Sequence, residues 1–384
     1  MITGLVEAIA ASSLVVFIGF FALYAIVCYW YTRRPRPTPN VVQGSLPTLT
    51  IIVPTYNEAA IIESRFENFR LLNYPRDKLQ IVFVDGGSKD GTPDLIEKLK
   101  SDLNVILVKQ GSRKGFNKAL LDGFAQASGE LIAFTGAETK FEPDAYLQMV
   151  KHFVDANVGA VTGRQRIRNL ERASPKIEAG YRSLYHFIRL AETAMDSPFD
   201  IKGEICVARR GIVEGLVRRP EVHERGCIDC CLSFQARQMG MKTVYEPDAV
   251  YVEDSPYSIR ESFAQDIRRG VTLIENMLLF KSMILNRRYG KFGLVIMPCH
   301  LIMLMITPFL LIVAALALSL SSILNVYSWT SFVIVAALLA VGFSRGLQGF
   351  VKAQLCLAAA NVALVLQFDT QRFKKLTSTR ILKP

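Results

Sequence analysis

The stretch "LTIIVPTYNE", Leu49–Glu58, is an apolar run that ends in polar, turn-forming residues. A short apolar run closed by a turn is typical of a buried strand. The same pattern recurs in "LQIVFVDGGSKDGT" (79–92), "NVILVKQ" (104–110) and "ELIAFTG" (130–136). Segments with helical spacing, such as "AIIESRFENFRLL" (60–72), separate these strands. Because strands and helices alternate, the sequence predicts an α/β fold with a mainly parallel sheet.

The basic residues of the chain gather beside its apolar runs. The chain has 384 residues, of which 51% are apolar, and a formal net charge of +11. Basic clusters such as "YTRRPRP" (31–37) and "NRRYGK" (286–291) resemble juxtamembrane anchors. The sequence shows no basic and aromatic stripe typical of a nucleic-acid groove. The charge therefore indicates contact with membrane lipids, and we expect no nucleic acid as partner.

Three of the seven cysteines form the segment "CIDCC", in which Cys227, Cys230 and Cys231 have C-x-x-C spacing. No second cysteine pair and no histidine cluster completes a zinc site in the sequence. We interpret these cysteines as small buried residues in a reducing compartment.

The N-terminal apolar run, residues 8–31, carries no charge and is long enough to cross a bilayer, which takes about 20 residues. It is too long for a cleaved signal peptide, and no basic segment precedes it. Arg33, Arg34 and Arg36 follow it, so the positive-inside rule places the next part of the chain in the cytoplasm.

Three further apolar runs, residues 293–324, 325–344 and 349–368, follow near the C-terminus, the last interrupted by Lys352. If all three crossed the membrane, the basic tail would lie outside, against the positive-inside rule. Either the rule fails for this tail, or one segment is re-entrant or interfacial.

These patterns predict six parts along the chain, all in or beside a cell membrane. They are an N-terminal transmembrane anchor (1–34), a Pro-rich linker (35–47), an α/β catalytic domain (48–257), interfacial amphipathic helices (258–291), a C-terminal transmembrane bundle (292–370) and a basic tail (371–384).

The order of four motifs resembles that of family 2 glycosyltransferases. "VPTYNE", "VDGGSKDGT", "RKGFNKAL" and "GELIAF" occur in the order and approximate spacing of that family, over roughly residues 48–270. The resemblance implies the Rossmann-like GT-A fold. The flanking apolar runs resemble the membrane-integral branch, which includes hyaluronan, cellulose and chitin synthases and polyprenyl-phosphate sugar transferases. The dinucleotide motif G-x-G-x-x-G and the P-loop are absent from the sequence.

The resemblance implies that the first two strand ends hold the nucleotide of a nucleoside diphosphate sugar. The residues at these positions are Thr55, Tyr56, Glu58 and Asp85. The basic loop at Arg113, Lys114 and Gly115 maps close to the donor, with Lys114 as the expected contact. Two alternatives remain: Asp85 and Ser88 cap the loop that follows, and the basic residues form a solvated helix start.

The D-x-D metal motif of the family falls on Gly136-Ala137-Glu138, so its first aspartate is missing. Mg²⁺ commonly takes one or two carboxylates together with substrate phosphates. We therefore expect a weakened site for Mg²⁺ or Mn²⁺, with Glu138 as the protein ligand.

The family's T-E-D motif falls on Cys227-Ile228-Asp229, before the helix "LSFQARQMG". The resemblance implies that Asp229 is the general base for the acceptor hydroxyl. A simple helix N-cap is the alternative, and Glu224 is the reserve candidate for the base.

"AQDIRRG" (264–270) resembles the Q-x-x-R-W motif of membrane-integral members. Gln265 aligns on the acceptor side, and Arg268 suits a diphosphate because a guanidinium matches phosphate oxygens. Arg269 replaces the Trp that contributes to the acceptor site in processive synthases, and it either faces the site or lipid headgroups. Gly203, in "IKGEICVARRG" (201–211), is expected to let the acceptor come close.

The expected function is that of a membrane-bound inverting hexosyltransferase. It would move a sugar from a nucleoside diphosphate sugar to a lipid-linked or cell-envelope glycan acceptor, with the catalytic domain in the cytoplasm. One alternative is a processive polysaccharide synthase, which the missing Trp disfavours. The other is a catalytically degenerate membrane protein that only binds a nucleotide sugar. The sugar, the base and the acceptor stay open.

Overall fold

The computed structural model describes residues 2–34, 46–256 and 258–367. The predicted basic tail (371–384) lies outside the described residues, as does the predicted linker (35–47) except for its last two residues.

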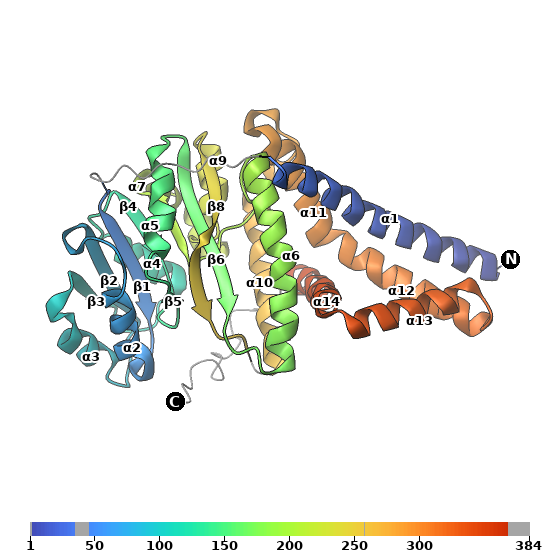
Figure 1. Ribbon diagram of the computed structural model, residues 1–384, viewed down its shortest axis with the longest axis horizontal. Coiled ribbons are helices and arrows are strands. Elements are labelled where there is room, and N and C mark those ends of the chain that lie inside the picture. The colour runs from blue at the N-terminus through green and yellow to red at the C-terminus, as the bar shows by residue number, and fades with distance from the viewer. Residues whose placement is uncertain (1, 35–45, 257, 368–384) are drawn as a thin grey trace.

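The centre of the molecule is a mixed sheet of eight strands in the order β3-β2-β1-β4-β7-β6-β8-β5 (Figure 1). The strands are β1 (Leu49–Thr55), β2 (Leu79–Asp85), β3 (Val105–Lys109), β4 (Leu131–Phe134), β5 (Lys140–Phe141), β6 (Val158–Ile167), β7 (Cys206–Arg209) and β8 (Lys242–Glu253). β3, β2, β1 and β4 are parallel to one another, and β6 is parallel to β8. β7 is antiparallel to both neighbours, and β5 is antiparallel to β8. The predicted mainly parallel α/β sheet is confirmed.

Helices cover both faces of the sheet. The α-helices of this part are α2 (Ala59–Arg70), α3 (Thr92–Leu99), α4 (Phe116–Phe124), α5 (Ala145–Val150), α6 (Ala173–Met195), α7 (Arg210–Val217), α8 (Pro220–Arg225), α9 (Leu232–Gln238) and α10 (Ile259–Leu279).

The strands read as continuous apolar runs because their side chains enter two cores. In β1, Ile51 and Val53 join one core with Phe66 of α2, while Ile52 joins the other with Leu120 of α4. A strand buried on both faces has no polar alternation, which is the pattern of a covered parallel sheet.

The apolar helices extend away from the sheet in Figure 1. They are α1 (Ile2–Thr32), α11 (Met297–Met305), α12 (Thr307–Leu324) and α13 (Trp329–Phe343), while the apolar helix α14 (Arg345–Val365) lies beside α10. Among the described residues, α1, α12 and α14 are long and apolar enough to cross a membrane by length and composition, whereas α13 is shorter.

Two of the expected apolar runs differ from the structure. The run 293–324 is divided, because α11 ends at Met305 and α12 begins at Thr307 with Pro308 in its first turn. The run 325–344 contains a helix of only 15 residues. Such a helix rises about 22 Å, less than the roughly 30 Å of a bilayer core.

α14 lies across the amphipathic helices α6 and α10. In Figure 1 it is seen nearly end-on, whereas α12 and α13 lie in the plane of the picture. Glycines allow the close approach: a Cβ at Gly349 would lie 2.8 Å from the Ile177 carbonyl oxygen, and one at Gly270 would lie 3.0 Å from the Ala360 Cβ. Lys352 of α14 pairs with Asp266 of α10 at 2.6 Å. α14 is therefore attached to the catalytic domain.

Candidate active site

The carboxyl ends of β1, β2 and β4 meet at one edge of the sheet, which we call the carboxyl edge. Thr55 pairs in register with Asp85, and Phe134 pairs with Ile52. β7 begins at the same edge, because its first residue, Cys206, pairs with Phe134. The loops after β1, β2 and β4 and the loop before β7 therefore share the edge where ligands bind in open α/β sheets.

The loop after β2 is a tight turn around the Asp85 carboxylate. Asp85 Oδ2 accepts hydrogen bonds from the backbone N–H of Gly87 at 3.0 Å and of Ser88 at 2.9 Å, and Oδ1 accepts from the Ser88 hydroxyl. Gly87 has a φ of +79°, which favours glycine. These contacts are those of the loop-capping alternative, and the nucleotide role of Asp85 stays a prediction.

The three loops expected around the nucleotide touch one another. The Arg113 guanidinium lies 4.8 Å from the centroid of the Tyr56 ring. A Cβ at Gly86 would lie 3.6 Å from that ring and 3.8 Å from the Arg113 Cα. The neighbouring Lys114 is exposed. The structure thus brings the β1, β2 and pre-α4 loops together, with Lys114 on their outer side.

Thr55 and Glu58 are buried members of the same loops. The Thr55 hydroxyl donates to the Val84 carbonyl oxygen at 3.4 Å. The backbone N–H of Glu58 donates to the Thr92 hydroxyl at 2.8 Å, so the loop after β1 is held against the start of α3. Both residues have contacts that fix the loops, and their contact with a nucleotide is untested.

Glu138 occupies the space above Gly136 in the loop after β4. A Cβ at Gly136 would lie 2.7 Å from Glu138 Oε2 and 3.1 Å from Oε1. The longer side chain of Glu138 therefore folds back over the position of the missing first aspartate, and the glycine makes room for it. Glu138 lines a cavity with Glu253, Asp254 and other residues. A carboxylate oxygen beside a diphosphate suits Mg²⁺ or Mn²⁺, so Glu138 fits as one ligand of the expected cation, whereas Asp254 is paired with Arg168 at 2.6 Å.

Arg65 of α2 supports this loop, a role that could not be predicted from its helical spacing alone. Its guanidinium, 1% exposed, donates to the Thr139 carbonyl oxygen and to the Thr135 hydroxyl at 3.2 Å, and to Asn68 Oδ1 at 3.2 Å. Among the described residues it forms no ion pair with a carboxylate. Burial lowers the pKa of Arg65 to about 10, and the charge of Glu138 partly opposes this shift. A buried cation thus lies beneath the carboxylate loop.

Asp229 is buried, 5% exposed, in the turn before α9. Its Oδ1 accepts a hydrogen bond from the Cys227 thiol at 2.6 Å and from the Cys230 backbone N–H at 2.9 Å. Cys231 is at the N-cap position of α9, and no side chain caps that helix. The N-cap alternative for Asp229 is therefore wrong. Burial and the nearby charge of Glu204 raise the pKa of Asp229, although the Cys227 hydrogen bond opposes them.

Gly203 lies directly against Asp229. A Cβ at Gly203 would lie 1.7 Å from Asp229 Oδ2, so only glycine fits here. The close approach that we expected of an acceptor is thus made by the Asp229 carboxylate itself. Because the Gly203 segment leads into β7, it also places Asp229 at the carboxyl edge.

The basic pair of α10 faces this region. Arg269 Nη2 lies 3.3 Å from Glu204 Oε1, so Arg269 pairs with the segment before β7, and its contact with lipid headgroups stays an alternative. Arg268 precedes Arg269 on α10, and burial together with the charge of Arg269 lowers the pKa of Arg268, while Cys227 and Glu204 oppose that shift.

Other candidates lie away from this group in their described contacts. Gln265 is on α10 three residues before Arg268, and no described contact ties it to Asp229. Glu224 is exposed on α8. His223 Nε2 contacts the Leu216 carbonyl oxygen at 2.9 Å. Glu224, the reserve candidate for the base, is thus a surface residue, and His223 has a structural contact.

Two titratable groups near the site were not singled out in the sequence. Burial and the charge of Glu204 raise the pKa of Glu253 to about 8, with Arg269 opposing and Glu138 adding to the shift. Burial and three neighbouring guanidinium groups lower the pKa of Lys202 to about 7. Perturbed pKa values gather at functional sites, but nothing in the linear sequence shows which distant charges will become neighbours.

The order of these loops on this sheet is that of GT-A glycosyltransferases. Residues 50–216 match the sequence model of Glycosyl transferase family 2, so the α/β domain that they form is identified as a member of that family.

Several known proteins are similar to the chain. A poly-beta-1,6-N-acetyl-D-glucosamine synthase of Staphylococcus aureus is 29% identical over 243 residues, which are 61% of this chain and 58% of that protein. A beta-monoglucosyldiacylglycerol synthase of Nostoc sp. is 30% identical over 181 residues, 46% of this chain and 39% of that protein. The chain thus spans less than two thirds of the length of these curated relatives.

One solved structure matches nearly the whole chain. The mannosyltransferase PcManGT from Pyrobaculum calidifontis, solved in complex with GDP-mannose and Mn²⁺, has a TM-score of 0.81 and 27% sequence identity. The match covers 95% of this chain and 100% of that one. The expected GT-A fold with its flanking apolar helices is thereby confirmed.

Proposed function

We propose that the chain is a membrane-bound inverting glycosyltransferase that moves a sugar from a nucleoside diphosphate sugar to a membrane-associated acceptor. The observation that carries this proposal is the position of Asp229. It is a buried carboxylate with a raised pKa at the carboxyl edge, beside Gly203. A buried carboxylate with a raised pKa binds a proton more strongly than an exposed one, as a general base requires.

The donor would lie along the carboxyl edge from the β2 turn to the loop after β4. The backbone and side chains of Tyr56, Asp85 and Arg113 would hold the nucleotide, and Arg268 would face the diphosphate. A divalent cation held by Glu138 and the diphosphate would offset the charge of the leaving group. This role is supported by the way in which Glu138 fills the space over Gly136.

In the transfer step, Asp229 would take the proton of the acceptor hydroxyl while that oxygen attacks the anomeric carbon. The bond to the diphosphate breaks on the opposite face, which inverts the configuration. Burial of Asp229 excludes water from the base. Because Gly203 has no side chain, the backbone around Gly203 can lie directly against the Asp229 carboxylate. Fixed charges of this kind commonly supply much of the rate enhancement.

A membrane-associated acceptor is supported by the helices that flank the site. Arg268 and Arg269 project from α10, and the other side of α10 packs against α14. The acceptor would therefore enter between the α10 surface and the catalytic domain, at the level of the apolar helices.

A processive polysaccharide synthase is the second candidate, favoured by the similarity to the poly-beta-1,6-N-acetyl-D-glucosamine synthase. The near full-length similarity to a mannosyltransferase favours the first. Product length with a labelled donor separates them: single additions support our proposal, and long polymers support the second candidate.

The central test is Asp229→Asn in purified membranes. Release of nucleoside diphosphate is measured in the presence of Mn²⁺ for a series of sugar donors, beginning with GDP-mannose. We expect turnover to fall about a hundredfold or more, since general bases contribute at least that much, while nucleotide binding persists. Glu224→Gln, on the exposed face of α8, is the matched control and should keep wild-type turnover. Unchanged turnover in Asp229→Asn would remove the base assignment. Nucleotide binding without turnover on any donor would favour the degenerate alternative.

A further inference from the structure

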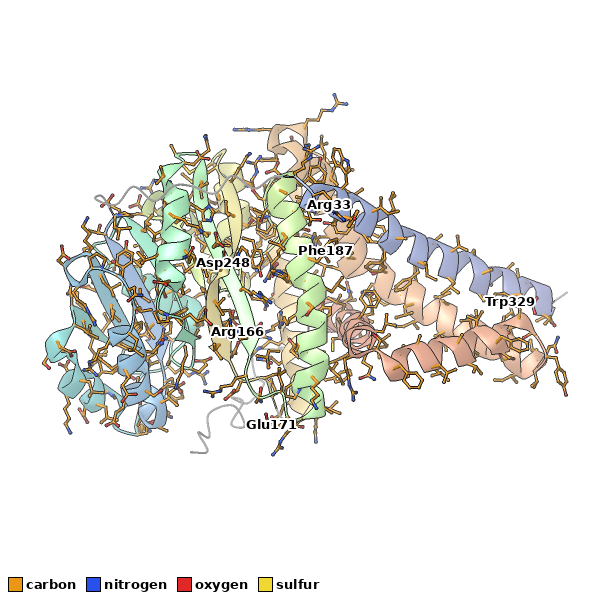
Figure 2. The ribbon with its side chains drawn as sticks, in the orientation of Figure 1. Arg33, Arg166, Glu171, Phe187, Asp248 and Trp329 are labelled. Carbon is orange, nitrogen blue, oxygen red and sulfur yellow. The ribbon has the colours of Figure 1, made fainter. Side chains whose placement is uncertain are left out.

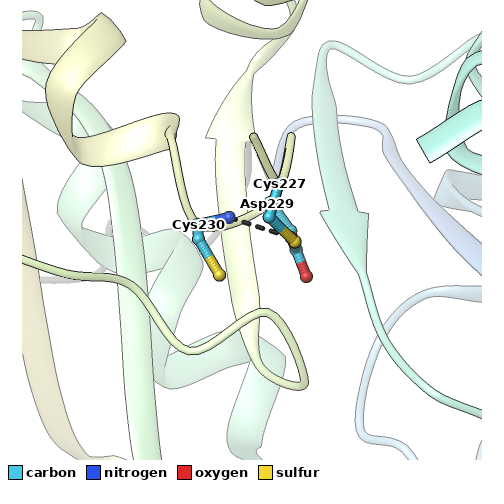
Figure 3. A group of neighbouring side chains, drawn as sticks. All are labelled: Cys227, Asp229 and Cys230. Carbon is cyan, nitrogen blue, oxygen red and sulfur yellow. Dashed lines mark hydrogen bonds between the residues drawn. The ribbon is translucent and has the colours of Figure 1, made fainter. Parts of the chain in front are cut away.

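The turn before α9 holds three possible metal ligands around one point (Figure 3). The Sγ atoms of Cys227 and Cys230 and a carboxylate oxygen of Asp229 all lie within 4.8 Å of one another. Two sulfurs and one carboxylate oxygen form a donor set that suits Zn²⁺ or Cd²⁺, whereas Mg²⁺ and Mn²⁺ favour oxygen ligands. This group is therefore chemically distinct from the Glu138 loop.

The turn is held in place from outside the cluster. The backbone N–H of Cys227 donates to Asn276 Oδ1 at 3.0 Å, and that of Ile228 donates to Asn117 Oδ1 at 3.2 Å. Asn117 also donates to two carbonyl oxygens at 2.8 and 3.0 Å, so it is fixed itself. Contacts outside a metal site orient its ligands. Because such contacts already hold this turn, its three ligands can bind a cation without a folding step.

We propose that Cys227, Asp229 and Cys230 bind one soft divalent cation of the Zn²⁺ or Cd²⁺ type. A water molecule or the acceptor hydroxyl would complete a four-coordinate site. On binding, each thiol loses its proton and both sulfurs form bonds to the cation, so two protons are released for each ion bound. The cation keeps its oxidation state, and no electron acceptor is needed.

Occupation of this site has a consequence for catalysis, which rests on the proposed function. An Asp229 carboxylate bound to a cation cannot take the acceptor proton, so a soft cation should inhibit transfer without competing for the hard-cation site at Glu138. The enzyme would then be sensitive to the availability of thiol-seeking metals.

Binding is tested without turnover on the purified full chain, kept reduced and free of oxygen. Titration with Cd²⁺ should give the near-ultraviolet thiolate-to-cadmium absorption, saturate at one ion per chain and release two protons. In Cys227→Ser/Cys230→Ser, whose hydroxyls can still donate to Asp229, the apparent affinity should fall by more than about tenfold, a loss that even outer-shell changes cause. Cys299→Ser, which removes a half-buried thiol on α11, should leave the titration unchanged.

Inhibition is tested separately at constant Mn²⁺, with each variant compared to its own rate without Cd²⁺. Cd²⁺ should inhibit wild type and Cys299→Ser equally and the double variant at least tenfold less. Equal Cd²⁺ absorption in the double variant, or its loss in Cys299→Ser, would overturn the site. Normal Cd²⁺ absorption with undiminished turnover would overturn the inhibitory role. If no donor gives turnover but Cd²⁺ absorption follows the expected pattern, the function fails and the metal site stands.

Discussion

At the scale of single residues, the loop after β4 shows how one substitution depends on another. Glycine at 136 removes the first carboxylate of the metal motif, yet the carboxylate of Glu138 lies over the vacated position. Glutamate has one more methylene than aspartate and can fold back, which needs the space that glycine leaves. The two departures from the family motif are therefore coupled through a single volume.

A methyl group at position 136 should therefore disturb the cation site more than the fold. In Gly136→Ala the new Cβ would lie 2.7 Å from Glu138 Oε2, the far end of a flexible side chain that can move away. We expect the Mn²⁺ concentration for half-maximal turnover to rise severalfold, with the midpoint of thermal unfolding nearly unchanged. The control is Gly211→Ala, where the added Cβ meets no atom within 4 Å. A Mn²⁺ requirement equal to that of wild type would show that Glu138 does not bind the cation.

Lys202 carries a second residue-level prediction, through its charge. Burial and the charges of Arg182, Arg269 and Arg189 lower its pKa from 10.5 to about 7. The folded state therefore binds this proton less tightly than the unfolded chain. The free energy of unfolding consequently rises as pH increases from about 7 toward about 10.5, and the charged form destabilises the fold below pH 7. Each unit of pKa difference corresponds to about 1.4 kcal/mol.

Replacing Lys202 by Met should raise the midpoint of thermal unfolding at pH 6, and the gain over wild type should shrink at pH 9. Thermal unfolding of both proteins at the two pH values measures this difference. Lys98→Met, at an exposed position of α3, should give no pH-dependent difference. A Lys202→Met protein that is less stable than wild type by the same amount at both pH values would contradict the charge argument.

At the scale of elements, much of the sheet could be predicted because its signal is local. The runs that became β1, β2 and β4 are mostly apolar and buried, since both of their faces are covered. The arrangement of the apolar helices was harder to predict, because hydropathy indicates the length and composition of a helix but not how it is oriented relative to the domain. Lys352, which read as a defect in an apolar run, is instead the contact between α14 and the domain.

The residues of the candidate site also divide into those with a local signal in the sequence and those without one. Asp85, Glu138 and Asp229 could be found because each stands within a recognisable run of neighbours. Arg65 and Glu253 could not, because their importance comes from partners that are distant in the chain: Thr135 lies 70 residues from Arg65, and Glu204 lies 49 residues from Glu253. Sequence spacing on a helix or strand carries no record of such long-range partners.

The attachment of α14 gives the prediction at this scale. The Lys352 ammonium, 12% exposed, lies 2.6 Å from Asp266 and 3.9 Å from Glu178, and it contacts the Ser262 hydroxyl. Removing the cation leaves a largely buried carboxylate on α10 without its described ion-pair partner. Loss of one member of such a pair commonly costs about 3–5 kcal/mol.

We therefore expect Lys352→Met to lower the midpoint of thermal unfolding in detergent by several degrees, and Lys352→Met/Asp266→Leu to recover part of that loss. Arg345→Met, at the start of α14 where Arg345 bonds only to Gln348 in its described contacts, is the matched control. If Lys352→Met and Arg345→Met behave alike, the ion pair does not attach α14.

At the scale of the whole molecule, the apolar helices α1, α12 and α13 all extend between the catalytic domain and the far end of the bundle. α1 and α12 lie side by side, and α13 returns toward the domain (Figure 1). Figure 2 shows Arg33 at the domain end of α1 and Trp329 at the opposite end of the bundle. The Lys291 ammonium lies 5.1 Å from the centroid of the Tyr31 ring, so the two basic clusters meet at the domain end. Such a basic and aromatic belt is typical of the interface between a membrane and water.

This arrangement bears on the conflict between three C-terminal crossings and a basic tail. α12 leads away from the domain and α13 leads back, while α14 lies across α6 and α10, at an angle to α1, and its Phe350 contacts Phe17 and Phe21 of α1. The charged helices α6 and α10 cannot lie within the hydrocarbon layer, because buried charges there are costly. We therefore interpret α14 as the interfacial segment, which keeps both of its ends on the side of the catalytic domain.

This topology is tested with single introduced cysteines in sealed vesicles of known orientation. Each variant is labelled with a membrane-impermeant maleimide, and the labelling of the native cysteines in wild type is subtracted. Leu366→Cys, just after α14, should react from the same side as Lys98→Cys in the catalytic domain. Tyr327→Cys, in the exposed turn between α12 and α13, should react from the other side. A Leu366→Cys that follows Tyr327→Cys would mean that α14 crosses the bilayer. It would then have to leave α6 and α10, and the Lys352–Asp266 pair seen here could not persist in the membrane.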